Sequence, residues 1–250
     1  MRHEADVVVQ RIMAACFEPA RPVESEGLEP FQQDAVARLR VMLDRRGGAV
    51  LADSVGLGKT HVAAALIREE VGRGGEVLVT APAELRSHWA RHLRGTRWRW
   101  VSHTSMSRRE CDRHSATLVV VDEAHAFRNP STKRYAALAL ACEQARVLLL
   151  SATPVNNSLL DFYNLVHLFA ADDAFVDIGV PDMRAAFEAA RRTGRSAGVR
   201  RIADTIMVRH TREMVALWGS RTRLTFPQSG DIEVLEYDLP DACPGLAECA

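Results

Sequence analysis

Short apolar runs alternate with segments of helical periodicity along the first two thirds of the chain. Apolar runs at residues 118–122 and 147–151 predict strands buried on both faces, and residues 49–52, 76–81 and 98–101 predict further strands. Helical periodicity predicts helices through residues 35–43, 62–67, 85–93, 132–143 and 159–169. This order predicts an α/β fold with a doubly wound, mainly parallel sheet flanked by helices, and it places ligands at the carboxyl ends of the strands.

The alternation of strands and helices stops at about residue 172. Residues 183–192 and 199–213 predict two Arg-rich helices, and residues 232–239 have strand character. We therefore divide the chain into an N-terminal extension (1–24), a main α/β lobe (25–175), a helical segment of the same lobe (176–222), and a linker or the start of a missing second lobe (223–250).

Composition excludes several classes of protein. With 250 residues, of which 47% are hydrophobic, the chain can bury a sizeable core. Lys+Arg and Asp+Glu each total 32, so nucleic-acid binding would need a local basic patch. No apolar run approaches the roughly 20 residues of a membrane span, and we expect a cytoplasmic protein without a membrane partner. The cysteines lack metal-ligand spacing, which predicts free thiols at Cys16, Cys111, Cys142, Cys243 and Cys249.

A glycine-containing loop lies between the predicted strand at 49–52 and the helix at 62–67. Gly56 and Gly58 permit positive φ, and the helix that begins near Lys59 adds its positive dipole end, which together predict an anion nest. Lys59 is expected to reach the β- and γ-phosphates of a nucleotide, and the Thr60 hydroxyl to hold Mg²⁺. The alternative is a glycine-containing turn with a solvent-exposed lysine. The nucleotide-contacting residues expected here are Asp53, Ser54, Val55, Gly56, Leu57, Gly58, Lys59 and Thr60.

The rarity of lysine gives this loop further weight. Almost every basic position is arginine, and the lysines are Lys59 and Lys133. A compact ammonium group fits inside a tight phosphate loop where a planar guanidinium does not. The phosphate-loop interpretation therefore gives a physical reason why position 59 is lysine and not arginine. The first loop position is Asp53 where the phosphate-loop pattern has glycine, so the match is incomplete.

An acidic pair follows the buried strand at 118–122. In Asp122-Glu123-Ala124-His125, Asp122 can hold Mg²⁺ directly or through water, and Glu123 can orient and deprotonate the water that attacks a γ-phosphate. Adjacent carboxylates at the mouth of an apolar strand are costly without a cation. The alternative is an acidic turn that caps the next helix.

In their order along the chain, these motifs resemble the first RecA-like lobe of superfamily 2 helicases, and more narrowly the bacterial Swi/Snf-type ATP-dependent DNA translocases. The resemblance rests on Gln32, residues 53–60, Ala81-Pro82, Asp122 to His125 with Arg128-Asn129, and Ser151-Ala152-Thr153-Pro154 with Asn156-Asn157. It covers residues 27–240 and implies a RecA-like P-loop NTPase domain. It also implies ATP and Mg²⁺ as cofactors, and double-stranded DNA and a second RecA-like lobe as partners.

The resemblance implies roles for further residues. Gln32 would contact adenine; the alternative is a surface glutamine at a helix start. The catalytic residues would be Lys59, Asp122, Glu123 and His125. His125 would also link the hydrolysis site to the DNA surface, together with Ser151 and Thr153. The alternative for His125 is a core histidine. Arg209-His210-Thr211-Arg212 resembles the basic segment that joins the two lobes. The residues expected to face DNA or couple to it are Pro82, Thr104, Ser105, Ser151, Thr153, Asn156 and Asn157.

The sequence departs from the family pattern in three ways. Ser54 stands where the family usually has Glu, and the interval from Trp89 to Asp122 is shorter than usual in the family, so a strand and a helix are expected to be reduced or lost there. The motifs of the second lobe, including its arginines, are absent. The sequence thus predicts the ATP-binding lobe of a DNA translocase that hydrolyses ATP once a second lobe is supplied. The alternative is a truncated or regulatory nucleotide-binding module with little or no intrinsic ATPase activity.

Overall fold

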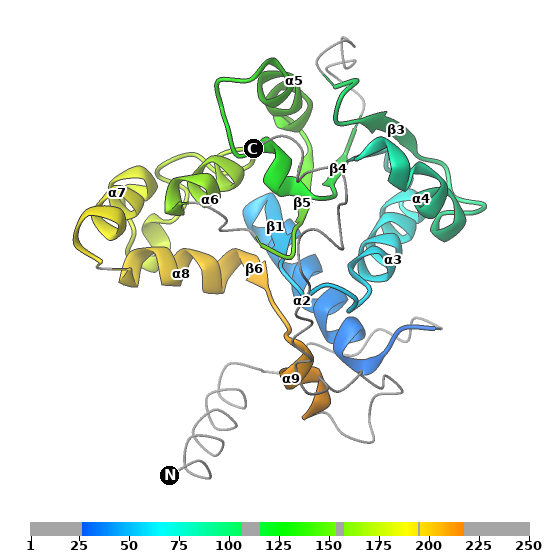
Figure 1. Cartoon of the computed structure of the whole chain (residues 1–250), viewed down its shortest axis with the longest axis horizontal. Coiled ribbons are helices and arrows are strands. Elements are labelled where there is room, and N and C mark those ends of the chain that lie inside the picture. The colour runs from blue at the N-terminus through cyan, green and yellow to red at the C-terminus, as the bar shows by residue number, and fades with distance from the viewer. Residues whose placement is uncertain (1–26, 107–115, 154–157, 195, 218–250) are drawn as a thin grey trace, which may run out of the picture.

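The computed structural model describes residues 27–106, 116–153, 158–194 and 196–217, and at its centre is a six-stranded sheet (Figure 1). The strands are β1 (Gly48–Leu51), β2 (Val77–Ala81), β3 (Arg99–Ser102), β4 (Leu118–Val121), β5 (Arg146–Leu150) and β6 (Met207–Val208). Their spatial order is β3-β2-β4-β5-β1-β6, and every neighbouring pair is parallel. The prediction of a parallel, doubly wound sheet is therefore confirmed.

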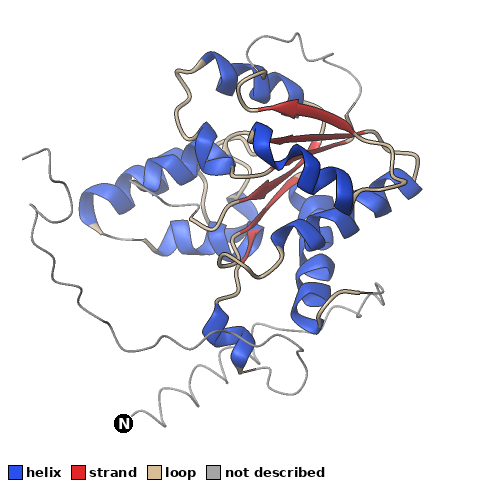
Figure 2. Ribbon diagram, turned by 45° about the vertical axis from the view of Figure 1, so that its right-hand side comes forward, coloured by secondary structure: helices blue, strands red, loops and turns tan. Residues whose placement is uncertain are grey.

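Helices cover both faces of the sheet (Figure 2). One face carries α2 (Pro30–Arg46), α3 (Lys59–Gly72) and α4 (Arg86–His92); the other carries α5 (Lys133–Cys142), α6 (Leu159–Val166), α7 (Met183–Thr193) and α8 (Ala197–Ile206). Alternate strand residues enter the two cores: in β1, Val50 joins one core, and Ala49 and Leu51 join the other. β1 and β4 are continuous apolar runs because both of their faces are buried, whereas the edge strand β3 is only partly buried.

The connection from α2 to β1 depends on two adjacent glycines. Gly47 ends the helix with a φ of 70°, a conformation that favours glycine. A Cβ atom on Gly48 would lie 2.1 Å from Cγ of Phe169, so the close approach of that ring excludes a side chain. Together the two glycines allow a helix to pass directly into β1, the strand that precedes the predicted phosphate loop.

The predicted helix at residues 199–213 is wrong as a single element. α8 ends at Ile206, β6 follows at residues 207–208, and a short helix, α9 (Arg212–Ala216), comes after it. The chain leaves the helical path because Met207 and Val208 pair in parallel with Val50 and Leu51 of β1. The predicted helix at 159–169 is also shorter, since α6 ends at Val166. The strand predicted near residues 98–101 is present as β3, although the interval around it is short.

Several predictions concern parts of the chain outside the described ranges. These are the N-terminal extension, the strand at 232–239, Asn156 and Asn157, and every cysteine except Cys142, which is buried in the core. Within the described ranges, no helix is long and apolar enough to cross a membrane.

Candidate functional site

The predicted site residues follow the carboxyl ends of the parallel strands. Asp53 comes after β1, Pro82 directly follows β2, Asp122 follows β4 and Ser151 follows β5. Backbone hydrogen bonds continue the sheet into these loops: Asp122 N donates to Thr80 O at 2.8 Å, His103 N to Ala81 O at 3.0 Å, and Ser151 N to Leu51 O at 3.1 Å. Because the strands are parallel, the sheet brings these residues to a single edge.

The loop from Asp53 to Thr60 has the geometry of an anion cradle. Gly56 and Gly58 have φ values of 86° and 76°, and Gly58 immediately precedes the first residue of α3. Leu57 is fully buried between Phe31 and Val215, which anchors the loop to the protein body. The first-turn N–H groups of a helix lack the usual carbonyl partner four residues earlier. In α3, His61 N donates to Gly58 O at 2.9 Å, so the N–H groups of Lys59 and Thr60 are the ones available to an anion.

Lys59 folds back over this loop instead of extending into solvent. Its Nζ donates a hydrogen bond to the Asp53 carbonyl at 2.8 Å and lies 3.5 Å from the Ser54 carbonyl. This geometry argues against the alternative of a simple turn with a solvent-exposed lysine. The ammonium group is held where the predicted phosphate chain would lie.

Gln32 fixes the far side of the loop. Its Oε1 accepts a hydrogen bond from Glu29 N at 3.0 Å, and its Nε2 donates to Leu57 O at 3.0 Å. The side chain is buried, and a Cβ atom on Gly58 would approach Nε2 to 2.5 Å. Gln32 is therefore not a surface residue at a helix start; its contact with adenine stays a prediction.

Asp122 is a buried carboxylate with one donor on each oxygen. Trp89 Nε1 donates to Oδ2 at 3.0 Å and Glu123 N donates to Oδ1 at 2.9 Å. Burial raises the pKa of Asp122, while these two hydrogen bonds and the Lys59 cation oppose that rise. Each oxygen keeps a lone pair. A single carboxylate with a hydroxyl such as that of Thr60 fits Mg²⁺, which usually takes one or two protein ligands together with phosphates and waters.

Glu123 lies next to Asp122 in a strained backbone conformation. Its φ of 48° is the only positive value of a non-glycine residue within the described ranges. Such a conformation costs roughly 1–3 kcal/mol and often occurs at functional sites. It separates the two carboxylates: Asp122 is buried, whereas the Glu123 side chain is 42% exposed. His125 Nδ1 lies 3.2 Å from Glu123 Oε2, close enough for attraction but without hydrogen-bond geometry.

The residues predicted to couple or contact DNA are only partly described. Ser151 is buried, and its Oγ accepts a hydrogen bond from Thr153 N at 3.3 Å. Thr104 and Ser105 follow β3, where Ser102 Oγ lies 3.2 Å from Thr104 Oγ1 and donates to Ser105 Oγ at 2.9 Å. The sheet places these groups at the same edge as Asp122, whereas Asn156 and Asn157 lie outside the described residues.

Sequence reasoning missed the roles of Trp89 and His210. The sequence marks Trp89 only as one position of the predicted helix at 85–93, yet a buried indole N–H normally finds an acceptor, and that requirement is a usable signal. His210 was assigned only to a basic connecting segment. In the structure its backbone N and its Nδ1 lie 2.7 and 2.9 Å from Asp53 Oδ1. Asp53 therefore anchors the loop from behind, which explains why the first loop position is not glycine.

A parallel RecA-like sheet thus carries the predicted phosphate loop after β1 and the acidic pair after β4, which is the arrangement typical of the P-loop class of folds. The family model of the SNF2-related domain matches residues 99–221, so this part of the chain is similar to an SNF2-related domain. The full motif set in the sequence, from Gln32 to Thr153, extends beyond that match at its amino-terminal side.

The chain is also similar to curated relatives, and its fold is similar to that of solved structures. The chain is 31% identical over 176 residues to "Uncharacterized ATP-dependent helicase YqhH" of Bacillus subtilis, covering 61% of this chain and 31% of that protein. It is 25% identical to "DNA repair and recombination protein RAD54-like" of Danio rerio, covering 81% of this chain and 33% of that protein. The structure titled "Sulfolobus solfataricus SWI2/SNF2 ATPase core in complex with dsDNA" matches with a TM-score of 0.63 at 18% identity, covering 82% of this chain and 48% of that chain. The chain thus spans at most about half the length of these proteins.

Proposed function

We propose that this chain is the ATP-binding lobe of an ATP-dependent double-stranded DNA translocase, in which Mg-ATP hydrolysis is coupled to DNA once a second RecA-like lobe is present. The observation that carries the proposal is the convergence of the phosphate loop and the acidic pair on one sheet edge, where burial raises the pKa of Asp122 and the Lys59 cation opposes that rise. The printed descriptions of the relatives, an ATP-dependent helicase and an ATPase core with duplex DNA, support it.

The residues of the site divide the chemistry among them. Lys59 and the first-turn amides of α3 bind the phosphate chain, and Gln32 holds the loop and contacts adenine. Thr60 and Asp122 would hold Mg²⁺, which would supply neutralising charge at the phosphates. Glu123, the more exposed carboxylate, orients the attacking water and accepts its proton.

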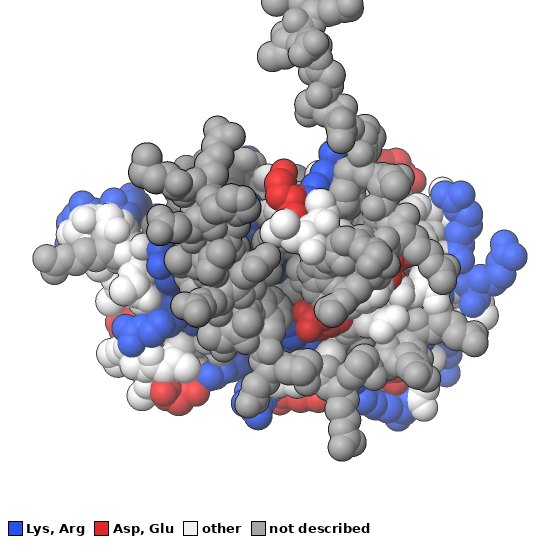
Figure 3. Space-filling model, turned by 90° about the horizontal axis from the view of Figure 1, so that it is seen from below, with Lys and Arg blue, Asp and Glu red and all other residues white. Residues whose placement is uncertain are grey.

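The DNA surface is proposed along the same edge, near the end of β3. Arg86, Trp100, Ser102 and Ser105 line a hollow of about 310 Å³ there, and hydroxyl groups with an arginine suit phosphate oxygens. Figure 3 shows another view of the surface, where Lys and Arg are interspersed with Asp and Glu around the margin. We therefore assign DNA contact to this local hydroxyl-lined surface and not to a positive electrostatic field of the whole chain.

Packed side chains link the proposed DNA surface to the acidic pair. The ring of His103, next to Thr104, meets the ring of Phe127 edge-on at 4.8 Å between centroids. Phe127 belongs to the short helix η2 (Ala124–Phe127) that directly follows Glu123. Burial lowers the pKa of His103 to about 4, so the imidazole is neutral at pH 7 and behaves as a packing group.

The proposal is tested by ATP binding to the full chain with Mg²⁺ supplied or withheld. We expect binding that depends on Mg²⁺, measured by fluorescence of a labelled ATP analogue or by calorimetry. Absence of nucleotide binding, or binding indifferent to Mg²⁺, contradicts the proposed site. If the chain binds ATP but duplex DNA does not change turnover once a second lobe is supplied, the alternative of a regulatory nucleotide-binding module is favoured.

Replacing Trp89 by phenylalanine is expected to weaken Mg²⁺ dependence selectively. The ring is kept, but the hydrogen bond from Nε1 to Asp122 is lost, and bonds to charged groups contribute about 1.5–3 kcal/mol. The Mg²⁺ concentration that half-saturates ATP binding should rise roughly 10- to 100-fold. Trp98→Phe, the same change at a half-buried ring away from the acids, is the matched control. An unchanged Mg²⁺ requirement in folded Trp89→Phe contradicts the positioning role of this indole.

A further inference from the structure

The segment that leaves the lobe runs alongside the phosphate loop. It consists of β6, residues 209–211 and α9, and we call residues 207–216 the strap. Figure 1 shows it in orange, running from the sheet at β6 to α9. Hydrogen bonds join it to consecutive parts of the loop: Ala52 N to Val208 O (2.7 Å), Ser54 N to His210 O (3.0 Å), and Arg212 Nη2 to Val55 O (3.1 Å). The strap thus fixes the loop backbone over several successive residues.

A buried pair, Asp53 and His210, forms the centre of this contact. The two side chains are 0% and 1% exposed, and Asp53 Oδ1 accepts from the backbone N of His210 while lying 2.9 Å from its Nδ1. The Asp53 carbonyl accepts from Lys59 Nζ. Asp53 therefore connects two parts of the site: its side chain contacts the strap, and its main-chain carbonyl contacts Lys59.

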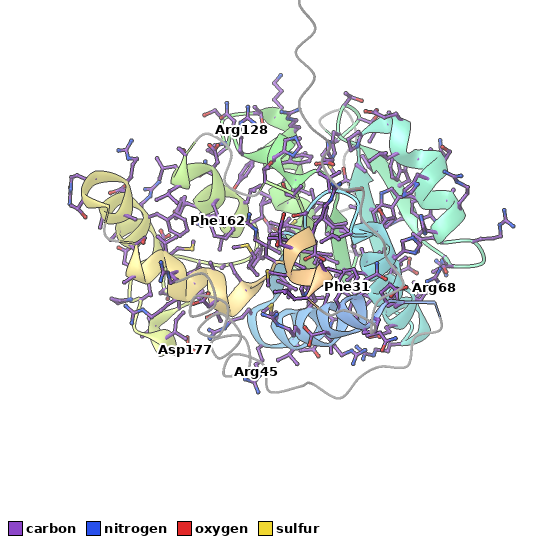
Figure 4. All side chains as sticks on the ribbon, turned by 60° about the horizontal axis from the view of Figure 1, so that its bottom comes forward. Phe31, Arg45, Arg68, Arg128, Phe162 and Asp177 are labelled. Atoms are coloured by element: carbon purple, nitrogen blue, oxygen red, sulfur yellow. The ribbon has the colours of Figure 1, made fainter. Side chains whose placement is uncertain are left out.

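Apolar contacts add to these hydrogen bonds. Val215 of α9 packs against Phe31 and the buried loop residue Leu57. The His210 ring meets the Phe31 ring edge-on at 5.6 Å between centroids, and Figure 4 shows Phe31 beside α9. Leu57 is also the residue whose carbonyl Gln32 holds, so α2 and the strap fix the same turn of the loop.

We propose that the strap positions the phosphate loop, with His210 as its positioning residue, so that strap docking and nucleotide binding are coupled. The inference rests on the proposed nucleotide site. Loss of the imidazole leaves the Asp53 carboxylate buried without its side-chain partner. Because a buried unpaired carboxylate is costly, the Asp53 side chain shifts toward solvent or water enters beside it. Either response displaces the Asp53 carbonyl that holds Lys59. By thermodynamic linkage, bound nucleotide strengthens strap docking by the same factor by which docking strengthens nucleotide binding.

Binding measurements on His210 variants give the first test. His210→Ala is expected to weaken Mg-ATP binding by about tenfold or more, because a hydrogen bond to a buried charge is lost. His210→Asn places an amide N–H near the position of Nδ1 and should restore affinity to within about threefold of the wild type. Arg209→Ala, at the exposed neighbour on the same strap, is the matched control and should bind as the wild type does. Wild-type affinity in folded His210→Ala overturns the proposal.

Hydrogen exchange in the full wild-type chain gives a test that does not depend on any variant folding. The amides of Ala52 and Ser54 donate to strap carbonyls, so their exchange rates report strap docking. Mg-ATP should slow both, while the Gly47 amide, at the opposite end of β1, should be unaffected. If Mg-ATP binds and these rates do not change, the coupling is wrong although the nucleotide site stands. If Mg-ATP does not bind at all, the proposed function itself fails.

Discussion

Lys59→Ala is expected to abolish Mg-ATP binding by this chain while leaving its fold intact. The cation of this lysine lies over the phosphate loop, bonded to the carbonyl of Asp53. Its ammonium group would form charge-assisted hydrogen bonds to phosphate, each contributing about 1.5–3 kcal/mol, so affinity should fall by about 100-fold or more when several are lost. Calorimetry or fluorescence titration with an ATP analogue measures the loss, and circular dichroism checks the fold.

The composition of the chain supplies a matched control for this experiment. Lys133 lies on the exposed start of α5, so Lys133→Ala removes the same charge far from the loop and should leave nucleotide binding unchanged. Lys59→Arg tests the size argument, because a planar guanidinium does not fit a tight loop that accepts a compact ammonium group. Wild-type binding by folded Lys59→Ala would show that the loop is not a phosphate site.

Most of the sheet could be predicted from the sequence because each strand buried on both faces is a continuous apolar run. β4 and β5 are such runs, and their neighbours in the sheet are parallel because long helical crossovers separate consecutive strands. β6 could not be predicted. It has only two residues, and it exists because Val208 and its neighbours meet the end of β1, which is a contact made far away along the chain.

The candidate site was predictable where its chemistry is local and not where it depends on distant partners. The glycines of the phosphate loop and the acids after β4 are consecutive in sequence, so residue type and spacing were enough. The partner of Asp122 is a tryptophan 33 residues earlier, and the partner of Asp53 is a histidine 157 residues later. No periodicity specifies such pairs. Asp53, which only weakened the motif match at first, proves to be the residue that ties the loop to the strap.

The isolated chain is expected to hydrolyse ATP at a rate near background, and a second RecA-like lobe with duplex DNA should raise turnover by about 10³- to 10⁵-fold. That range is the effect of an arginine that reaches the transferring phosphoryl group from outside its own site. Glu123 can orient water, but within the described structure no arginine is placed over the phosphate loop except Arg212, whose guanidinium already donates to Val55 O.

Steady-state phosphate release measures this effect, with the second lobe supplied in a longer chain or as a separate protein. Glu123→Gln in the same assembly should retain ATP binding and lose turnover, because the amide cannot accept the proton of the attacking water. Duplex DNA should stimulate hydrolysis without strand separation, since the resemblance is to translocases, and a strand-displacement assay separates the two activities. Robust turnover by the isolated chain contradicts this account, because the loop and the acidic pair would then suffice without charge from a second lobe.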